Sequence, residues 1–218
     1  MSLLDELGPP ARFALAYAPK AVRQATAALL ALDVRLGQIV ARANEPILAQ
    51  MRLAWWRDRL KEEPEARPKG DGVLEAIGEH WTGREGALIA FVDGWEELLA
   101  EGTLDVASIE AFGESHAAAF EGLSNGTLSG ADKINVRERA KLYAWGKLHA
   151  RTSDSAERER IAGVALPLAA RGGRLPRSQR PLAILSGLAA YSLRHEGEGL
   201  MASRGGILTA WRIALSGR

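Results

Sequence analysis

The spacing of apolar residues along this chain is that of α-helices. From Val22 onward, apolar side chains recur in steps of three and four, at Ala25, Leu29, Leu32, Leu36, Ile39 and Val40. This period places them on one face of a helix. Pro19 comes just before the stretch, and proline is tolerated where a helix starts. The helix should end at Asn44-Glu45-Pro46, because the residue before a proline disfavours the α conformation.

Further segments carry the same period. A second helix should begin at Pro46 and run to about Glu63, and a polar linker follows over 62–72. Other helices are predicted at 88–99, 109–123, 136–149, 157–170, 181–193 and 207–215. Pro167 should kink or end the helix over 157–170, whereas 124–127 and 171–176 should be loops. No stretch alternates as a strand would, and no repeat of fixed period is found. The chain is therefore expected to be an all-α helical array with a single domain over 1–218.

Composition narrows the class of protein further. With 218 residues the chain is long enough for one domain, and without cysteine it has no disulfide or thiolate metal site. A net charge of +1 gives no reason to expect a nucleic-acid partner. Asp5 and Glu6 stand where a secretory signal would be basic, and the longest small and apolar run, Ala162 to Ala170, is too short to cross a membrane. We expect a cytoplasmic protein without a transmembrane segment, at most in peripheral contact with a membrane.

The histidines and tryptophans fit structural roles better than catalytic ones. There is no His-Glu-x-x-His helix, phosphate loop or nucleophile elbow. His116 lies on an apolar stripe and is interpreted as a core histidine, whereas His149 and His195 lie near helix C-termini, where the helix dipole favours a cation. Trp55 and Trp56 are about 100° apart on a helix, so only one of them can fill the core. The stripes predict that Leu32 and Trp55 are buried.

A basic loop surrounds Pro176. Its arginines are Arg171, Arg174, Arg177 and Arg180. One interpretation is a solvated connector between two helices. The other is a docking patch for anionic lipid headgroups or a diphosphate, because guanidinium groups pair bidentately with phosphate oxygens.

The first sixty residues resemble a known family. The strings that carry the resemblance are Arg12-Phe13, Ala18-Pro19, Arg23, Leu32-Asp33, Pro46 and, most specifically, Arg52-Leu-Ala-Trp-Trp-Arg-Asp58. They are similar to the squalene/phytoene synthase family of prenyl-diphosphate condensing enzymes in isoprenoid biosynthesis. Tyr143-Ala-Trp-Gly and Gly173-Arg-Leu-Pro176 stand where that family has a tyrosine-bearing helix and a related turn. The resemblance, good to about residue 150, implies an isoprenoid-synthase fold with a central cavity.

The resemblance also implies a metal requirement that this sequence does not meet. In the family, two Asp-x-x-x-Asp motifs on facing helices hold magnesium ions that bridge to the substrate's diphosphate, and carboxylates one turn apart supply the oxygen ligands. Here Asp33 stands at the first position of the first motif, but Gly37 stands at the second. The place of the second motif, Leu166 to Arg171, has no carboxylate. We therefore expect a degenerate active site with no metal and no cofactor.

Some residues remain as candidates for ligand binding. They are Arg12, Arg23, Asp33, Arg52, Arg57 and Tyr143. Asp33 would be the remnant of the first acidic motif, and the arginines would hold a diphosphate as basic residues of active relatives do. The competing interpretation of the arginines is ordinary surface ion pairing, which contributes little per pair.

Two functions stay open. The first is a non-catalytic family member, a scaffold, assembly factor or isoprenoid-binding protein, with an isoprenoid or lipid ligand or a protein partner. Complex I assembly factors of this superfamily are a precedent, since their Arg-x-Gln-Phe-Trp-like string is similar to Arg52–Trp56. The second is a prenyl-diphosphate transferase with an altered Mg²⁺ site. Carboxylates converging on Asp33 would favour the second function, and their absence would favour the first.

Overall fold

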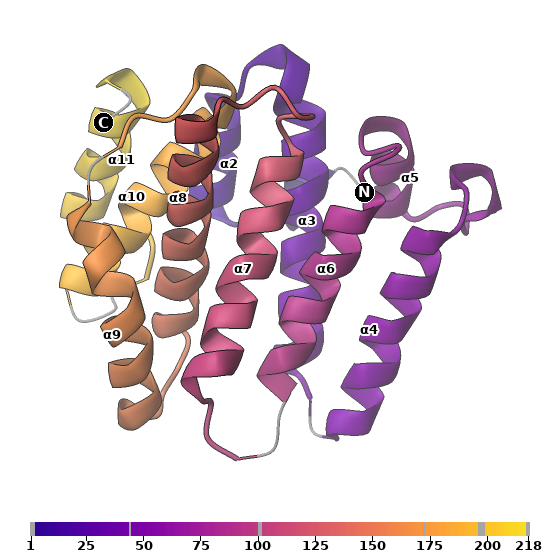
Figure 1. The fold of residues 1–218 in the computed structure, drawn as a ribbon, viewed down its shortest axis with the longest axis horizontal. Coiled ribbons are helices and arrows are strands. Elements are labelled where there is room, and N and C mark those ends of the chain that lie inside the picture. Colours follow the sequence, from indigo (N-terminus) through magenta and orange to yellow (C-terminus); the bar gives the residue numbers. More distant parts are fainter. Residues whose placement is uncertain (1–2, 44, 100–101, 172, 196–198, 217–218) are drawn as a thin grey trace.

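The protein folds as an array of helices (Figure 1). The computed structural model describes residues 3–43, 45–99, 102–171, 173–195 and 199–216, so Met1, Asn44 and Gly172 lie outside the described residues. The α-helices are α1 (Leu3–Glu6), α2 (Pro9–Ala16), α3 (Lys20–Ala41), α4 (Pro46–Lys61), α5 (Gly72–His80), α6 (Glu85–Glu96), α7 (Val106–Gly122), α8 (Gly130–His149), α9 (Ser155–Ala170), α10 (Arg180–Arg194) and α11 (Arg204–Ser216). Short 3-10 helices occupy Pro64–Ala66, Glu97–Leu99 and Arg177–Gln179. Within the described ranges there is no β-strand, which confirms the all-α prediction.

The predicted helices are present with small differences at their ends. Helix α8 begins at Gly130, earlier than predicted, because Ser129 caps it by accepting a hydrogen bond from the backbone N–H of Asp132. Helix α9 continues through Pro167 to Ala170, so the proline does not end it. Helices α1, α2 and α5 were not predicted. Helix α5 is capped by Asp71, whose side chain accepts from two backbone N–H groups in the first turn.

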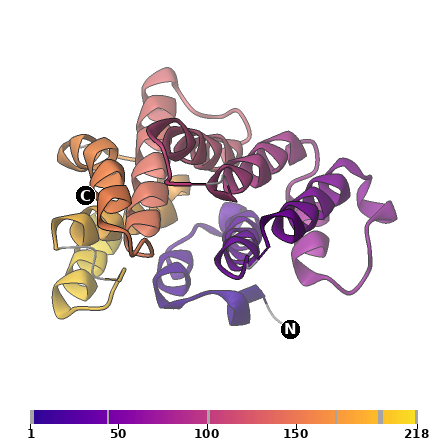
Figure 2. The same ribbon diagram turned by 90° about the horizontal axis from the view of Figure 1, so that it is seen from below.

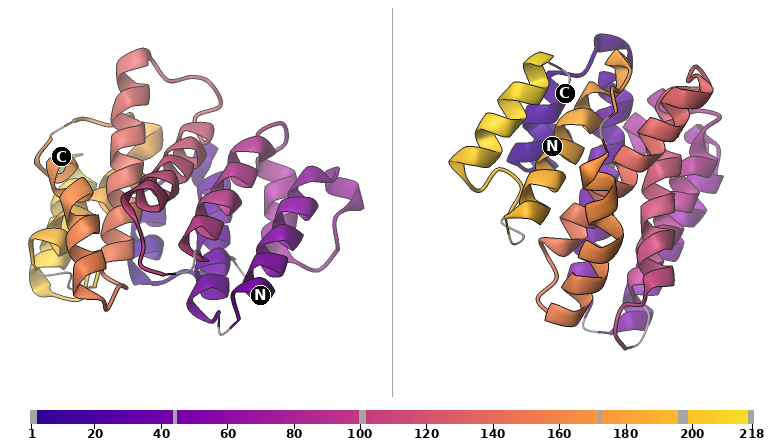
Figure 3. Two further views of the ribbon diagram at one scale, coloured as in Figure 1. Left: turned by 60° about the horizontal axis from the view of Figure 1, so that its bottom comes forward. Right: turned by 60° about the vertical axis from the view of Figure 1, so that its left-hand side comes forward.

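The helices pack mainly on their neighbours along the array. Helix α4 packs on α6, α6 on α7, α7 on α8, α8 on α10 and α10 on α11. Helix α3 contacts α4, α5 and α6, and in Figure 2 the indigo N-terminal helices lie on one side of this row. Helix α4 and the C-terminal helices lie at opposite ends of the molecule (Figure 3). None of the helices described is long and apolar enough to span a lipid bilayer.

Helix α8 is fixed in the middle of the array by close contacts on two sides. A Cβ placed on Gly146 would lie only 2.5 Å from the Cβ of Ala189, so glycine is what lets α8 approach α10 this closely. On the other side, the Trp145 indole lies against Gly113 and its Nε1 donates to the backbone oxygen of Ile109 at 2.7 Å. These contacts determine the position of the remaining side chains of α8.

The burial of α4 differs from the prediction. Leu32 of α3 is fully buried, as expected, but Trp55 is 41% exposed and the prediction that it is buried was wrong. Trp56, 4% exposed, takes the core position together with Leu53 and Leu60. Helix α4 lies at the end of the array, where only one side is covered by α3 and α6. The stripe that includes Met51 and Trp55 therefore faces outward.

Leu32→Ala should lower the free energy of unfolding by about 2–5 kcal/mol, because it leaves a cavity at a fully buried position. Chemical denaturation monitored by circular dichroism measures this loss. Met51→Ala is the matched control, since Met51 is 65% exposed, and it should change stability by less than about 0.5 kcal/mol. Equal losses in both variants would contradict the assignment of faces on α3 and α4.

Candidate functional site

Two charged side chains meet in the interior between α3 and α8. Asp33 of α3 and Lys147 of α8 are 5% and 7% exposed. The Lys147 Nζ lies 2.6 Å from each carboxylate oxygen of Asp33. Two buried opposite charges at this distance form an ion pair in a low-dielectric environment. Asp33 is therefore already neutralised by a residue of the same chain.

His116 of α7 and Tyr143 of α8 complete this cluster. The His116 Nδ1 lies 3.0 Å from the backbone oxygen of Phe112, and because a carbonyl oxygen only accepts, Nδ1 carries the proton. The other ring nitrogen, Nε2, then accepts from Lys147 Nζ at 3.3 Å. The Tyr143 hydroxyl donates to Asp33 Oδ2 at 3.3 Å. An ammonium group has three protons, and here Asp33 and His116 provide an acceptor for each of them.

The local electrostatics favour this arrangement. Burial alone would raise the pKa of Asp33, but the nearby Lys147 ammonium holds that pKa well below its usual range. Burial lowers the pKa of Lys147, and the Asp33 carboxylate opposes this effect. Burial and repulsion by Lys147 lower the pKa of His116, so the imidazole is neutral at pH 7. Burial and the Asp33 charge raise the pKa of Tyr143 well above 10, which keeps its proton in place for Asp33.

Aromatic rings surround the lysine. Its Nζ lies 4.7 Å from the ring centroid of Trp95, 5.2 Å from that of Tyr143 and 5.8 Å from that of Phe112. Cation–π attraction adds to the ion pair at such distances, and most strongly where water is excluded. The ammonium group is thus held by a carboxylate, an imidazole and three aromatic faces.

Gly37 lies one helical turn from Asp33, and its surroundings leave little room for a side chain. A Cβ at this position would lie 3.0 Å from Cη2 of Trp95 and 3.2 Å from Nη1 of Arg151. Arg151 lies two residues after the end of α8, just past its C-cap residue Ala150. Each of the two positions of the first acidic motif therefore lies near a cation, Asp33 near Lys147 of α8 and Gly37 near Arg151.

A small cavity opens beside the cluster. Its volume is about 260 Å³. Asp33, Tyr143, Lys147 and Arg151 form its polar side. Apolar residues of four segments form the rest, namely Pro10, Ala11, Leu30, Val34, Leu185 and Leu200. The cavity can accommodate a small apolar group with a polar or anionic end.

Magnesium does not fit the donor set at this site. The ion prefers octahedral coordination by oxygen ligands, including one or two carboxylates. Among the residues that the structure describes, Asp33 is the single carboxylate lining the cavity, and Lys147 already contacts both of its oxygens. No group of three or more His, Cys, Asp or Glu residues suited to a metal occurs in the described part of the chain. The last residues of α9, from Leu166 on, also contain no carboxylate.

The predicted arginines are not gathered around Asp33. Arg12 donates to the backbone oxygen of Leu7 at 2.7 Å, and Arg23 donates to that of Ala18 at 2.8 Å. Arg57 pairs with Asp93, with Nε and Oδ1 2.6 Å apart, and with Glu96. Each of them is engaged locally, and their role in ligand binding stays a prediction.

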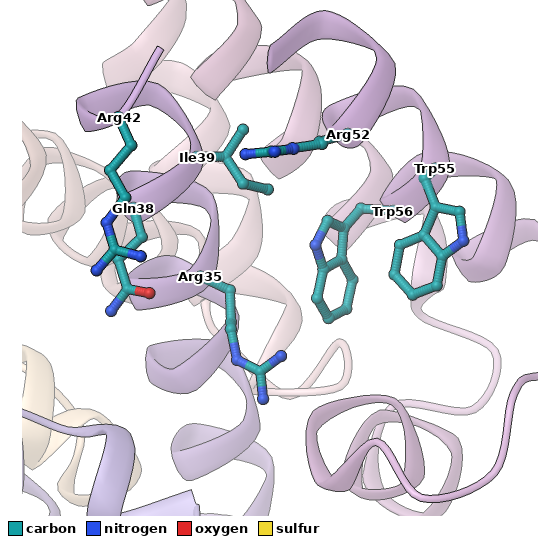
Figure 4. Close-up of a pocket in the computed structure, with 7 residues that line it drawn as sticks. All are labelled: Arg35, Gln38, Ile39, Arg42, Arg52, Trp55 and Trp56. Atoms are coloured by element: carbon teal, nitrogen blue, oxygen red, sulfur yellow. The ribbon is translucent and has the colours of Figure 1, made fainter. Parts of the chain in front are cut away.

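Arg52 and the basic loop lie elsewhere on the surface. Arg52 lines a groove between α3 and α4 with Trp55 and Trp56 (Figure 4). In the loop, Arg171 is exposed and pairs with Glu138, with the nitrogen and oxygen 2.7 Å apart. The structure thus brings together Asp33 and Tyr143 from the predicted residues and leaves the arginines apart.

Sequence reasoning missed Lys147, the residue that defines the site. Its one signal is position, because Lys147 lies one helical turn after Tyr143 on a face of α8 that also includes Ala140 and Ala144. From the sequence alone, a lysine at this position would be placed at the exposed edge of the helix, because its buried acidic partner is not apparent. His116 is indeed a core histidine, as predicted, but it also takes part in the cluster through Nε2.

The fold and the site define a class of protein. The described helices form an all-α array in which α3 turns Asp33 toward a cavity between helices, and this arrangement is consistent with an isoprenoid-synthase-like fold. Residues 11–119 match the family model for squalene/phytoene synthase, and the chain belongs to this family. No curated protein and no solved structure shows a significant match to it.

The matched segment covers one part of the site. It includes Asp33, Gly37 and the string from Arg52 to Asp58, and it reaches His116 on α7. It ends before α8, so Tyr143 and Lys147 lie outside it. The likeness of 143–146 and 173–176 to family motifs therefore rests on the sequence strings alone.

Lys147→Met should lower the free energy of unfolding by about 3–5 kcal/mol, because it leaves the Asp33 carboxylate buried and unpaired. The double variant Asp33→Asn/Lys147→Met removes both charges and should recover most of that loss. Denaturant unfolding of the two single variants and the double variant measures the coupling. Additive losses would mean that the two charges do not interact.

The pair should also make stability depend on pH in acid. The folded-state pKa of Asp33 lies below the value of about 3.9 expected for an unfolded chain. Its contribution is therefore complete above that value and is lost as the pH falls, at up to about 1.4 kcal/mol per pH unit. Between about pH 5 and 2, the free energy of unfolding should fall more steeply with decreasing pH for the wild type than for Asp33→Asn/Lys147→Met. The same pH dependence in both proteins would contradict the assignment of the ion pair.

Proposed function

We propose that this protein is a non-catalytic member of the squalene/phytoene synthase family that acts as a scaffold, assembly or isoprenoid-binding factor. One observation carries the proposal. The Lys147 ammonium lies against both oxygens of Asp33, where a metal-dependent relative would need that carboxylate for a divalent cation. Because Asp33 already neutralises the Lys147 ammonium, this lysine can do little to stabilise the negative charge of a departing diphosphate.

The reaction of the family depends on charge that this site does not supply. Metal ions stabilise the negative charge that develops as diphosphate leaves, and this effect amounts to several kcal/mol. In this chain the three protons of Lys147 are taken by Asp33 and His116, and the ammonium is enclosed by aromatic rings. Arg151 remains at the edge of the cavity. It can pair with an anionic group, but a single arginine does not replace a cluster of metal ions.

The size and lining of the cavity support binding rather than condensation. Its volume of about 260 Å³ lies below the range of roughly 300–1,000 Å³ usual for small-molecule sites. A condensing enzyme has to hold two prenyl diphosphates at once. The apolar wall and Arg151 suit one short isoprenoid or lipid chain with an anionic end, so this is the ligand class we propose.

The proposal includes the broader expectations from the sequence. We take residues 1–218 as one domain of a cytoplasmic protein that needs no metal and has no nucleic-acid partner. A scaffold or assembly factor also needs a protein partner, and we include such a partner in the proposal. The alternative, a prenyl-diphosphate transferase with an altered Mg²⁺ site, is favoured by one observation, the cavity that opens beside Asp33.

Incubation with farnesyl or geranylgeranyl diphosphate and Mg²⁺ or Mn²⁺ should give no condensed product by mass spectrometry. Adding Mg²⁺ with methylenediphosphonate, a diphosphate analogue without an isoprenoid chain, should leave the melting temperature unchanged. A ligand that binds only the folded state would raise it, and we expect the site to bind neither of the two. A fluorescent isoprenoid or fatty acid, added without metal, should bind. Its binding should weaken about tenfold or more in Arg151→Glu, which reverses the charge at the cavity edge.

Asp33→Ala serves as the control for the transferase alternative. Metal-dependent turnover in the wild type that disappears in Asp33→Ala would overturn the non-catalytic proposal in favour of that alternative. Circular dichroism of Asp33→Ala must accompany the assay, since the variant leaves Lys147 buried and unpaired. If that variant unfolds, Asp33→Asn/Lys147→Met takes its place.

A further inference from the structure

The outer face of α4 exposes four large apolar side chains. They are Ile47, Leu48, Met51 and Trp55. The inward face of the same helix is also apolar, with Ala49, Leu53, Trp56 and Leu60 buried. A helix with apolar side chains on opposite faces is usually buried on all sides, whereas α4 lies at the end of the array. An exposed apolar patch of this kind marks a surface that another molecule covers.

A cationic groove lies beside this patch. It has a volume of about 290 Å³ between α3 and α4 (Figure 4). Ile39 and Trp56 contribute apolar surface, and three arginines, Arg35, Arg42 and Arg52, line the groove. Arg35 is held by Glu6 and Asp71. Arg42 and Arg52 are exposed, and within the described residues no ion pair or side-chain hydrogen bond engages either guanidinium.

The chemistry of the groove and the patch specifies the occupant. Two unpaired guanidinium groups suit the oxygens of a phosphate, with which arginine pairs bidentately. From Pro46 to Arg57, helix α4 contains no acidic residue, and the exposed acids Glu45 and Asp58 flank this stretch at its two ends. Apolar side chains and a half-exposed tryptophan beside arginines are the pattern of a helix that lies in a lipid–water interface. An anionic phospholipid surface supplies both the phosphate and the apolar phase.

A second copy of the chain fits less well. Helix α11 repeats the spacing of apolar and basic residues on α4. The α4 string from Ile47 is Ile-Leu-x-x-Met-Arg-x-x-Trp, and the α11 string from Ile207 is Ile-Leu-x-x-Trp-Arg-x-x-Leu. Both stripes are apolar and basic, so pairing α4 of one copy with either stripe of another would bring like charges together. On α11, moreover, Trp211 already packs against Phe13, with ring centroids 5.5 Å apart.

We propose that the protein docks on anionic membranes through α4, with a lipid phosphate between Arg42 and Arg52 and with Ile47, Met51 and Trp55 in the interface. The groove and the Asp33 cavity share no lining residue. The proposal therefore stands whether or not that cavity binds a ligand.

Co-sedimentation with vesicles tests the proposal. The wild type should bind vesicles of phosphatidylcholine mixed with phosphatidylglycerol and should bind pure phosphatidylcholine vesicles at least about tenfold more weakly. Arg42→Glu/Arg52→Glu should reduce binding to the anionic vesicles by at least about tenfold. Met51→Asp/Trp55→Ser should also reduce it, because the interfacial apolar contact is lost. All these positions are exposed, and circular dichroism should report unchanged folding.

Helix α11 provides the matched control. Leu208→Asp/Arg212→Glu removes one apolar and one basic side chain from the exposed stripe of α11, which does not line the groove between α3 and α4, and should bind anionic vesicles like the wild type. Excess glycerol 3-phosphate should compete only weakly, because it lacks the apolar part. Equal losses in the α4 and α11 variants would indicate nonspecific adhesion and overturn the proposal. Binding to neither type of vesicle would also overturn it and leave the α4 face to a protein partner.

Discussion

The buried ion pair between Asp33 and Lys147 is the constraint around which the centre of this protein is arranged. Two charges removed from water are tolerated only if they pair closely and their remaining hydrogen bonds are satisfied. Here α3 supplies the carboxylate, α8 the ammonium and the phenol, and α7 the imidazole that accepts the last ammonium proton. The relative positions of three helices are thus tied to one set of hydrogen bonds. The close approach of α8 to α10 at Gly146 holds the lysine in register.

The sequence predicts the helices well and the site only in part, for separable reasons. Helical periodicity reflects burial along a local segment, so the bounds of α3 and α10 can be read from neighbouring residues. The burial of Trp55 and Trp56 depends on which side of α4 is covered, and apolar residues on both of its faces leave the choice open. The pairing of Asp33 with Lys147 joins positions 114 residues apart, which no local pattern reports.

The family match and the Asp33–Lys147 ion pair rest on different parts of the chain. The segment that matches the squalene/phytoene synthase family ends before α8, and α8 contributes the lysine that takes up the oxygens of Asp33. A fold can be retained while its site changes, because the packing of helices and the placement of a few side chains are different requirements. Helix α3 takes part in two separate features, since Asp33 lines the inner cavity while Arg35 and Gln38 line an outer groove.

The packing around Gly37 has a consequence for any attempt to build a second carboxylate into α3. Gly37→Asp would place the new Cβ 3.0 Å from Cη2 of Trp95 and 3.2 Å from Nη1 of Arg151, so the added carboxylate would lie beside a guanidinium. Lys147 would still contact both oxygens of Asp33. One substitution on α3 would therefore not create a metal site, because Trp95 would have to shift and two cations would have to release the carboxylates.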